Sequence, residues 1–395
     1  MVSRVTNQML TNQLLGNLSL NLSNMDRLQN QLSTGRKYGH ISDDPSALIY
    51  GQAARNKLAR LSHFQSSVST AQTWLTQGEA GIMELQKVLG NVYEELVSAG
   101  SVKTAEDKRN VAMMVSQLRD HYLDTLNASY GDRFVFAGYN TPGDHAEGRD
   151  PTIKPFTLDS SGNLLFNGFN TSIFDGMPSG LFNINLTGMD DAQIDAAFDA
   201  AVLRMTDESG NPLYPGGFAD FQAVFPDIDK DSLLMMHQLM NDVINFDVGP
   251  GISMPVTVNG LDIIFFTTRD DSGNFIIRNT FSLLDEVHLA INGDIENNVD
   301  PETTDTLTKL IKLVQDSQNH LLVKTAEIGG RQRRLELLEA RYEQDNLNYE
   351  NMRSDAEDAN LAEVIMYLRM SETVYQAALS AGARIIQPSL MDFLR

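Results

Sequence analysis

The two ends of the chain share one hydrophobic pattern. Apolar residues recur there at alternating spacings of three and four, which is typical of helices that bury one narrow stripe against partner helices. In the helix predicted over residues 1–33, the stripe consists of Val2, Val5, Met9, Leu15, Leu18, Leu22, Met25 and Leu32. In the helix predicted near the C-terminus, it consists of Leu361, Ile365, Leu368, Tyr375, Leu379 and Ile386. Neither helix can bury its stripe alone, so we expect the ends to pair antiparallel, to form an assembly interface and to order on assembly.

The longest regular pattern lies in the second predicted helix. Over five heptads its seam positions are Leu61, Phe64, Val68, Ala71, Leu75, Gly78, Ile82, Leu85, Leu89, Val92 and Leu96. Only Gly78 supplies no side chain, and we therefore predict a coiled-coil helix. A further helix is predicted over 104–130. Another begins at Asp300–Pro301, with an N-cap residue and a first-turn proline, and we expect a kink at "IGGRQ", 328–332.

Residues 140–300 have a different character, rich in Gly, Pro, Asp and Asn with short apolar runs. The form D-x-S-G-N occurs at 159–163, 207–211 and 270–274, and strand-like runs flank the first and third, which predicts hairpin turns. Two stretches, "DAQIDAAFDAAVLRM" and "DSLLMMHQLMNDVINF", predict helices. The expected fold is mainly α with an inserted α+β domain. A long antiparallel coiled-coil rod is formed by N- and C-terminal helices, with a β-rich globular domain at its far end.

A short break, "LSTGRKYGHISDDPSAL" over 32–48, separates the first two helices. Gly35 suits a left-handed helix C-cap, and the basic pair after it lies near the negative end of the helix dipole. Ser42, Asp43 or Asp44 can cap the next helix, and Pro45 fits its first turn.

Composition narrows the possible functions. The 395-residue chain has no cysteine, which excludes disulfides, thiol catalysis and thiolate metal sites. Its formal charge of −22 argues against nucleic acid as a partner, and the excess of acid is concentrated in 141–300. We expect no membrane span, because no apolar run approaches 18 residues, and no secretory signal peptide, because the start lacks an apolar core and a cleavage site.

Candidate chemistry is sparse. The best metal candidate is "DIDKDS", where Asp227, Asp229 and Asp231 open like a calcium loop. The sixth position is Ser232 instead of Gly and the twelfth is Gln238 instead of Glu, so the simpler interpretation is a solvated loop whose Asp231 caps the following helix. The seven histidines show no metal-binding spacing, and no nucleophile or phosphate-binding glycine motif occurs. We expect no enzyme activity and no cofactor.

Three stretches carry a resemblance to a known family. "QLSTGRKYGHISDDPSAL" resembles an L-x-T-G…S-D-D-P-x-A segment, and "YGDRFVFAGYNTPGDHAEGRDPTIKPF" resembles F-x-F-x-G-x-x-T followed by P-F. The C-terminal "AEVIMYLRMSETVYQAALSAGARIIQPSLMDFL" resembles a Y-Q-A-A-L…P-S-L ending. These motifs resemble the flagellin superfamily, and within it the proteins of the junction between hook and filament, for which Pro45 is typical. The resemblance covers about 1–156 and 301–395.

The resemblance implies a domain plan. Residues 1–41 and 357–395 would form an inner coiled-coil domain that is disordered in the monomer. Residues 42–139 and 301–356 would form a helical rod, and 140–300 an acidic outer α+β domain. An inter-domain spoke between inner and outer helices would comprise Gly35, Arg36, Ser42, Asp43, Asp44 and Pro45.

The resemblance also implies partners and location. The chain would be a structural subunit of the extracellular bacterial flagellum, exported by the type III apparatus. It would form a ring of copies that adapts the hook, through hook-associated protein 1, to the flagellin filament, and an export chaperone would hold its C-terminal helix. A minor flagellin of the filament is the alternative. An adhesive or calcium-binding module in the middle domain is a third hypothesis from another class.

Overall fold

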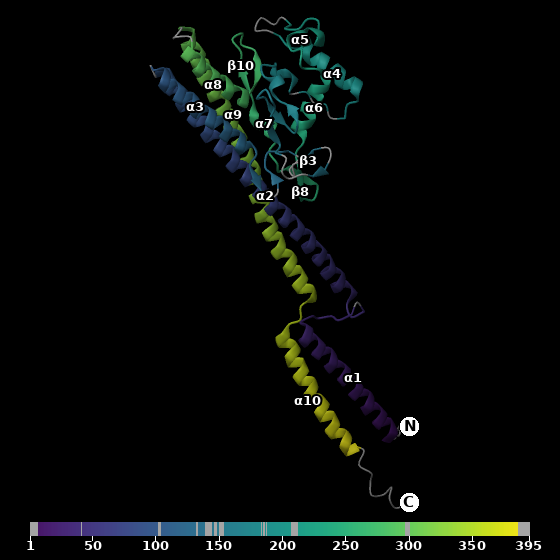
Figure 1. Ribbon diagram of the computed structural model, residues 1–395. Helices are drawn as coiled ribbons and strands as arrows, with labels where there is room; N and C mark the ends of the chain where they lie inside the picture. The colour runs from purple at the N-terminus through teal and green to yellow at the C-terminus, as the bar shows by residue number, and fades with distance from the viewer. Residues whose placement is uncertain are drawn as a thin grey trace, which may run out of the picture. The chain divides into compact units, whose positions relative to one another are not determined.

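The computed structural model describes residues 7–40, 42–101, 104–131, 133–138, 144–145, 148–149, 154–182, 184, 186, 188–206, 212–296 and 301–385. Most of these residues are helical (Figure 1). The α-helices are α1 (Asn7–Thr34), α2 (Pro45–Ser101), α3 (Ala105–Leu126), α4 (Asp191–Leu203), α5 (Phe218–Val224), α6 (Lys230–Asn241), α7 (Gly260–Ile264), α8 (Thr280–Glu296), α9 (Pro301–Glu357) and α10 (Leu361–Ile385). Short 3₁₀ turns lie at η1 (Ser172–Phe174) and η2 (Ser179–Leu181).

The described strands are short and pair antiparallel in small sheets. The two-stranded sheets are β1 (Ser129–Tyr130) with β2 (Arg133–Phe134), β3 (Asp144–His145) with β4 (Gly148–Arg149), β8 (Asn245–Gly249) with β9 (Ile252–Pro255), and β10 (Phe265–Arg269) with β11 (Phe275–Asn279). One sheet has three strands, β5 (Phe156–Leu158), β6 (Leu164–Phe166) and β7 (Phe169–Asn170). A mainly helical chain with an α+β insertion is therefore confirmed at this coarse level.

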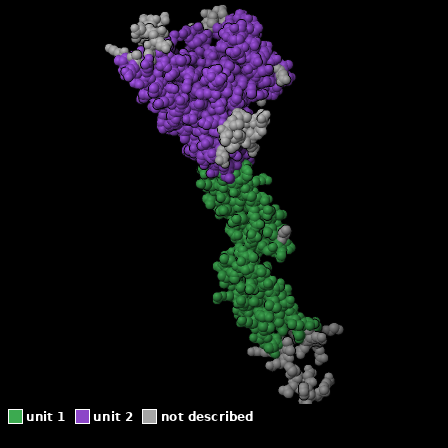
Figure 2. Space-filling model, in the orientation of Figure 1, with its two compact units in different colours: residues 1–65, 339–395 green, residues 66–338 purple. Residues whose placement is uncertain are grey.

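The chain divides into two compact units (Figure 2). Unit 1 comprises residues 1–65 and 339–395, and unit 2 comprises residues 66–338. The long helices α2 and α9 contribute residues to both units.

The predicted seam of α2 is buried. From Val68 to Leu96 its apolar positions are at most 1% exposed, and α9 runs antiparallel beside α2 in unit 2. Gln86 Nε2 donates to Thr325 Oγ1 at 3.1 Å, and Gln332 Nε2 donates to Glu79 Oε2 at 2.9 Å. Long apolar stripes on both helices thus form the helical core of unit 2, as the spacing predicts.

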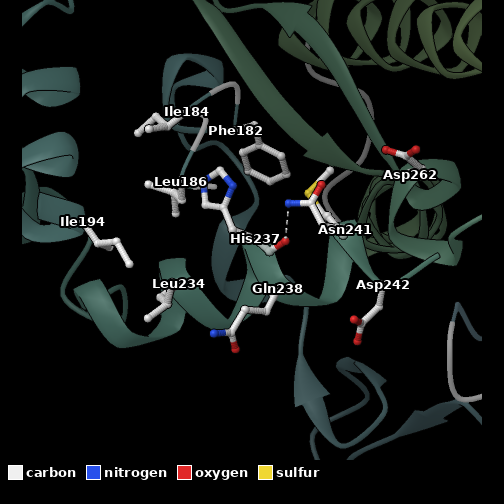
Figure 3. Close-up of a pocket in the computed structure, with 11 residues that line it drawn as sticks. Phe182, Ile184, Leu186, Ile194, Leu234, His237, Gln238, Asn241, Asp242 and Asp262 are labelled. Atoms are coloured by element: carbon white, nitrogen blue, oxygen red, sulfur yellow. Dashed lines mark hydrogen bonds between the residues drawn. The ribbon is translucent and has the colours of Figure 1, made fainter. Parts of the chain in front are cut away.

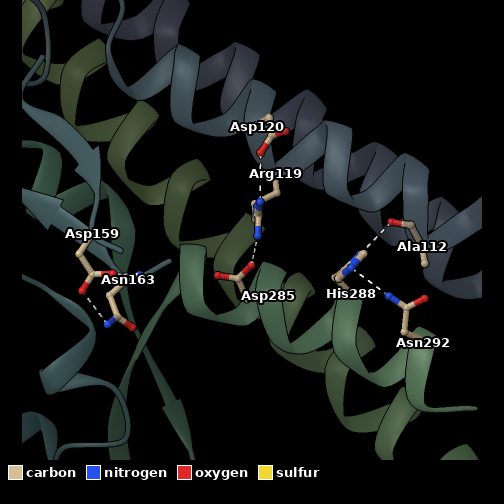
Figure 4. A network of polar contacts seen from close by, with 8 residues as sticks. All are labelled: Ala112, Arg119, Asp120, Asp159, Asn163, Asp285, His288 and Asn292. Carbon is tan, nitrogen blue, oxygen red and sulfur yellow. Dashed lines mark hydrogen bonds and ion pairs between the residues drawn. The ribbon is translucent and has the colours of Figure 1, made fainter. Parts of the chain in front are cut away.

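The middle of the chain contains a helix that the sequence analysis misses. α8 packs along α3 (Figure 4), where the Arg119 guanidinium pairs with Asp285 and the His288 ring bonds to Ala112 O at 2.9 Å. Its buried face is Phe281, Leu284, Val287 and Ile291, each at most 1% exposed, at spacings of three, three and four. The helical signal is therefore present in the sequence, directly after the strand run of β11.

Two of the three D-x-S-G-N loops form the predicted hairpin turns with the same geometry. The Asp159 carboxylate accepts from Ser161 N at 2.7 Å and from Asn163 N at 2.8 Å. Asp270 does the same with the amides of Ser272 and Asn274, at 2.9 and 2.8 Å. The third copy, 207–211, lies outside the described residues. The fourth residue of each described turn is a glycine with a positive φ, which explains why the motif needs glycine there.

At two glycines of α2, side chains from later in the chain pack directly against the helix. A Cβ at Gly81 would lie 2.5 Å from the Phe136 ring, and one at Gly78 would lie 3.2 Å from Val258 Cγ2. Gly78 is the seam position without a side chain, and Val258 fills the space that a side chain would occupy. We call Gly78 and Gly81 the glycine seat. It holds Phe136, from the F-x-F-x-G motif, against the helical core.

Several element boundaries differ from expectation. Helix α3 ends at Leu126 rather than near 130, after an N-cap at Thr104. In "RFVFAGYNT" the described strand is limited to Arg133–Phe134. Helix α9 runs without interruption through 328–332, where a kink is expected, because Gly329 and Gly330 keep helical geometry.

Candidate assembly surface

Helices α1 and α10 of unit 1 pair antiparallel, as the shared stripes predict (Figure 1). Asn21 Nδ2 donates to Ser371 O at 3.4 Å, and a Cβ at Gly382 would lie 2.5 Å from Leu14 Cδ2. Gly382, where the stripe of α10 has no side chain, is thus the position at which Leu14 of α1 packs against α10.

The pairing face is rotated slightly from the predicted stripes. The predicted residues Leu18, Met25, Leu368 and Tyr375 are half-buried, while Leu28 and Val364, which the prediction omits, are the most buried apolar side chains of the pair at 7% exposed each. Val5 and Ile386 lie outside the described residues. The spacing identifies the two helices but not which of two adjacent stripes faces the partner.

The other stripe residues stay open to solvent. Their exposed fractions are 61% for Met9, 57% for Leu15, 48% for Leu22, 46% for Leu361, 41% for Ile365 and 47% for Leu379. Together with Leu20, Leu32, Met366, Tyr367, Met370 and Val374, which are also exposed, we call them the open apolar residues. Two helices can cover only one stripe of each other, so these side chains can be buried only by a further partner.

The predicted spoke residues lie in one linker between α1 and α2. Gly35 has φ +69° and its N–H bonds to Gln31 O at 2.9 Å, which confirms the left-handed cap. The Asp44 carboxylate accepts from Ala47 N at 3.0 Å and so caps α2, whose first residue is Pro45. These two features fix where α1 ends and where α2 begins.

Within the linker, Asp43 closes a small turn. Its carboxylate accepts from His40 N at 2.9 Å and from Gly39 N at 3.1 Å. Hydrogen bonding from the His40 N–H, above all, lowers the pKa of Asp43. Ser42 is exposed beside it, and Arg36 forms an isolated antiparallel bridge with Asp358, in the linker between α9 and α10.

The calcium-like loop is used for helix capping. Asp229, rather than Asp231, is the N-cap of α6, and its carboxylate accepts from Ser232 N at 2.7 Å. Hydrogen bonding from the Ser232 side chain, and then from its amide, lowers the pKa of Asp229. The correction follows from helix geometry, since the cap must precede the first helical residue, Lys230. Asp227 and Asp231 are exposed, and among the described residues no three His, Asp or Glu side chains gather as a metal site.

A hollow of about 700 Å³ lies beside α6 in unit 2 (Figure 3). Its lining combines an apolar wall that includes Phe182, Ile184 and Leu234 with the polar residues Asn241 and Asp242. The described residues that line it include no Ser, Thr, Cys or Lys, and its ionisable side chains are those of His237, Asp242 and Asp262.

The one histidine among the described residues that line this hollow makes a structural hydrogen bond. The ring of His237 is buried, and its Nε2 lies 2.7 Å from Leu181 O. Burial lowers the pKa of His237, more strongly than the bond to Leu181 O raises it. A neutral ring that donates to a backbone carbonyl supports packing, not acid–base chemistry.

Among the described residues, none of the helices combines the length and apolar character that a bilayer crossing requires.

Comparison with known proteins agrees with these features. The model of the bacterial flagellin N-terminal helical region matches residues 5–141. The chain is 26% identical to flagellar hook-associated protein 3 of Salmonella typhimurium over 150 residues, which is 37% of this chain and 47% of that protein. It is 25% identical to flagellar hook-associated protein 3 of Escherichia coli over 186 residues, 45% of this chain and 58% of that protein. The chain thus spans about half the length of the curated relatives it matches.

A solved structure shows the same fold. It is that of a Vibrio parahaemolyticus protein assigned as flagellar hook-associated, with a TM-score of 0.50 and 15% identity, and it covers 80% of this chain and all of the other. The solved structure supports the fold, while the family model and the two curated relatives confirm the resemblance to the flagellin superfamily and to hook-associated protein 3.

Proposed function

We propose that this chain is a structural subunit of the bacterial flagellum, located at the junction between hook and filament. The observation that carries the proposal is the set of open apolar residues on α1 and α10, in a chain similar to flagellar hook-associated protein 3. Burying one such half-exposed side chain contributes about 1 kcal/mol, so a dozen of them can drive association of copies.

The proposed domain plan follows the sequence. Residues 1–41 and 357–395 are the inner coiled-coil domain, which orders on assembly. Residues 42–139 and 301–356 form a coiled-coil rod, and 140–300 form a β-rich outer domain at its far end. The open apolar residues and the long buried stripe of α2 support this plan.

The proposed partners are further copies of the chain in a ring, hook-associated protein 1 on one side and flagellin on the other. An export chaperone covers the C-terminal helix before assembly, and the protein works extracellularly after type III export. The seam residues of the assembly interface are Val5, Met9, Leu15, Leu18, Leu22, Met25, Leu361, Ile365, Leu368, Tyr375, Leu379 and Ile386. We assign the chain no catalytic role.

A substitution at an open position tests assembly without disturbing the subunit. Leu379→Asp places a charge on a side chain that is 47% exposed in the single chain, so the purified protein should stay folded. In an assembled coiled coil the same charge would be buried without a partner, and incorporation into flagella should be lost. Leu368→Asp and deletion of 361–395 should give the same loss.

The matched control is Val224→Asp, an exposed apolar residue at the end of α5 in the middle of the chain. It should leave incorporation and motility intact, as judged by electron microscopy and swimming assays. Normal incorporation of Leu379→Asp would contradict the proposal.

Two measurements separate the alternatives. Filaments formed by the purified chain alone would favour a minor flagellin over a junction subunit. A rise in melting temperature with millimolar calcium would favour a calcium-binding module in the middle domain, despite the use of Asp229 as a helix cap.

A further inference from the structure

Glu357, the last residue of α9, is a buried carboxylate in unit 1. The residue is 6% exposed, and its side chain pairs with the guanidinium of Arg55 on α2. Gly51, one turn before Arg55, leaves room for it, because a Cβ at Gly51 would lie 2.8 Å from Glu357 Cγ. A buried carboxylate is retained only with a partner, so Arg55 and the space at Gly51 together hold Glu357 in place.

The backbone of the same residue ties two linkers together. Lys37 N donates to Glu357 O at 2.7 Å, and Ala359 N donates to Gly35 O at 2.8 Å. These bonds flank the bridge between Arg36 and Asp358. The linker from α1 to α2 and the linker from α9 to α10 are thus joined as two short antiparallel segments.

We infer that Gly51, Arg55 and Glu357 form a latch that couples the two linkers, so that they open and close as one. Glu357 belongs to both parts of this arrangement, since its side chain pairs with Arg55 and its carbonyl accepts from Lys37. Displacing the carboxylate must therefore move the backbone that holds the other linker. The coupling of the two linkers is inferred from this geometry alone. Its consequence is that the latch positions the α1–α10 pair for assembly, and this consequence rests on the proposed function.

The latch gives each of its residues a distinct role. Glu357 is a positioning residue that acts through the linkers, and Arg55 compensates its charge. Gly51 is required because any side chain would displace the carboxylate. Lys37 adds a side-chain bond from Nζ to Asp355 O at 3.0 Å, which reinforces the same contact.

An engineered disulfide measures linker closure directly. Because the flanking hydrogen bonds come from the neighbours of Arg36 and Asp358, these two residues form a non-hydrogen-bonded pair, with Cα atoms about 4.5 Å apart. That spacing fits a disulfide. The chain has no cysteine, so Arg36→Cys with Asp358→Cys gives one defined pair whose effective concentration can be measured in glutathione buffers.

Substitutions in the latch should lower the effective concentration of the two cysteines. We expect Arg55→Met and Gly51→Ala to lower the effective concentration about 10-fold, and Glu357→Gln to lower it less, since the amide keeps the shape. The control is Gly16→Ala on α1, where a Cβ meets nothing within 4 Å, and it should leave the effective concentration of the cysteine pair unchanged. Circular dichroism verifies that each variant is folded. Equal values in all variants, or no disulfide in the parent pair, would overturn the inference.

A second readout separates the latch from the proposed function. In flagella, Arg55→Met should reduce incorporation, and oxidising the cysteine pair in that background should restore it. If the effective concentrations change as expected but incorporation does not, the latch stands and its role in assembly is wrong. If incorporation falls without any change in the disulfide measurement, the latch is wrong and the assembly proposal is unaffected.

Discussion

The helical core of unit 2 and the α1–α10 pair of unit 1 carry the same type of apolar stripe, yet they bury it to different extents. Leu75, Leu85 and Leu89 of α2 are fully buried, whereas Leu15 and Leu379 keep about half of their surface in water. In unit 2, helices α3, α8 and α9 supply partners within the chain. In the α1–α10 pair each helix has one partner, so a heptad stripe specifies that a helix needs neighbours but not whether its own chain provides them.

The largest expected difference between the two regions concerns leucine truncation. Leu85→Ala removes a fully buried side chain and should lower the free energy of unfolding by about 2–5 kcal/mol. Leu379→Ala removes a half-exposed one and should stay within about 0.5 kcal/mol. Urea unfolding of the purified chain compares them, and equal losses would show that α1–α10 is a self-contained core.

The glycine seat gives the next largest effect. Gly81→Ala would place a Cβ 2.5 Å from the Phe136 ring, and overpacking of this kind should destabilise unit 2 by about 1–3 kcal/mol. Gly329→Ala, in α9 of the same unit, meets nothing within 4 Å and should instead stabilise it by up to about 1 kcal/mol. Opposite shifts in melting temperature are expected. A stabilising Gly81→Ala would show that Phe136 does not rest on this glycine.

Acid should act on unit 2 before unit 1. Burial lowers the pKa of His320, whose Nε2 lies 2.7 Å from Asp262 O, and it also lowers the pKa of His237. The unfolded chain takes up a proton on each ring as pH falls below about 6.5, while the folded chain does not. Stability present above that pH is therefore lost below it, by up to about 1.4 kcal/mol per pH unit for each histidine.

His320→Gln tests the acid effect by removing one of these two rings. The stability of this variant should depend less steeply on pH between 6.5 and 5 in urea unfolding, whatever its stability at neutral pH. His40→Gln, at an exposed position in unit 1, is the matched control and should keep the parent slope. An unchanged slope for His320→Gln would mean that the ring takes up a proton in the folded state.

The smallest expected effect is a gain in α1. Gly16→Ala should raise helix stability by up to about 1 kcal/mol, because alanine has less conformational freedom to lose than glycine and the added Cβ meets nothing within 4 Å. Slower amide hydrogen exchange across α1, with unchanged exchange in α3, would verify it. Faster exchange would indicate that Gly16 faces a close partner.

Local signals explain what could be predicted from the sequence. Gly35 and Pro45 mark helix termini because their backbone preferences are intrinsic, and the Asp of each of the two described D-x-S-G-N turns bonds to amides two and four residues away. The stripe from Val68 to Leu96 was predictable because one uninterrupted period covers it. None of these features depends on a distant partner.

The sequence predicted that the two end helices pair, but not the individual contacts that depend on distant partners. The burial of Leu28 and Val364 depends on how α1 and α10 face each other, and the role of Glu357 depends on Arg55, about 300 residues earlier. Neither has a sequence spacing that could reveal it. For Asp229 and α8 the local pattern was present in the sequence. The cap was assigned to the neighbouring Asp231, and the helical spacing of α8 was missed because it directly follows the strand run of β11.

The glycine seat has a consequence for how the inserted region can change. A helix of the core contributes two positions without side chains; Phe136, just before the insertion, and Val258, within it, occupy them. Any replacement for the region between these residues would therefore have to return a ring and a β-branched side chain to the same two positions. A foreign domain grafted onto this helical core should therefore be tolerated if it places an aromatic ring at Gly81 and a β-branched side chain at Gly78.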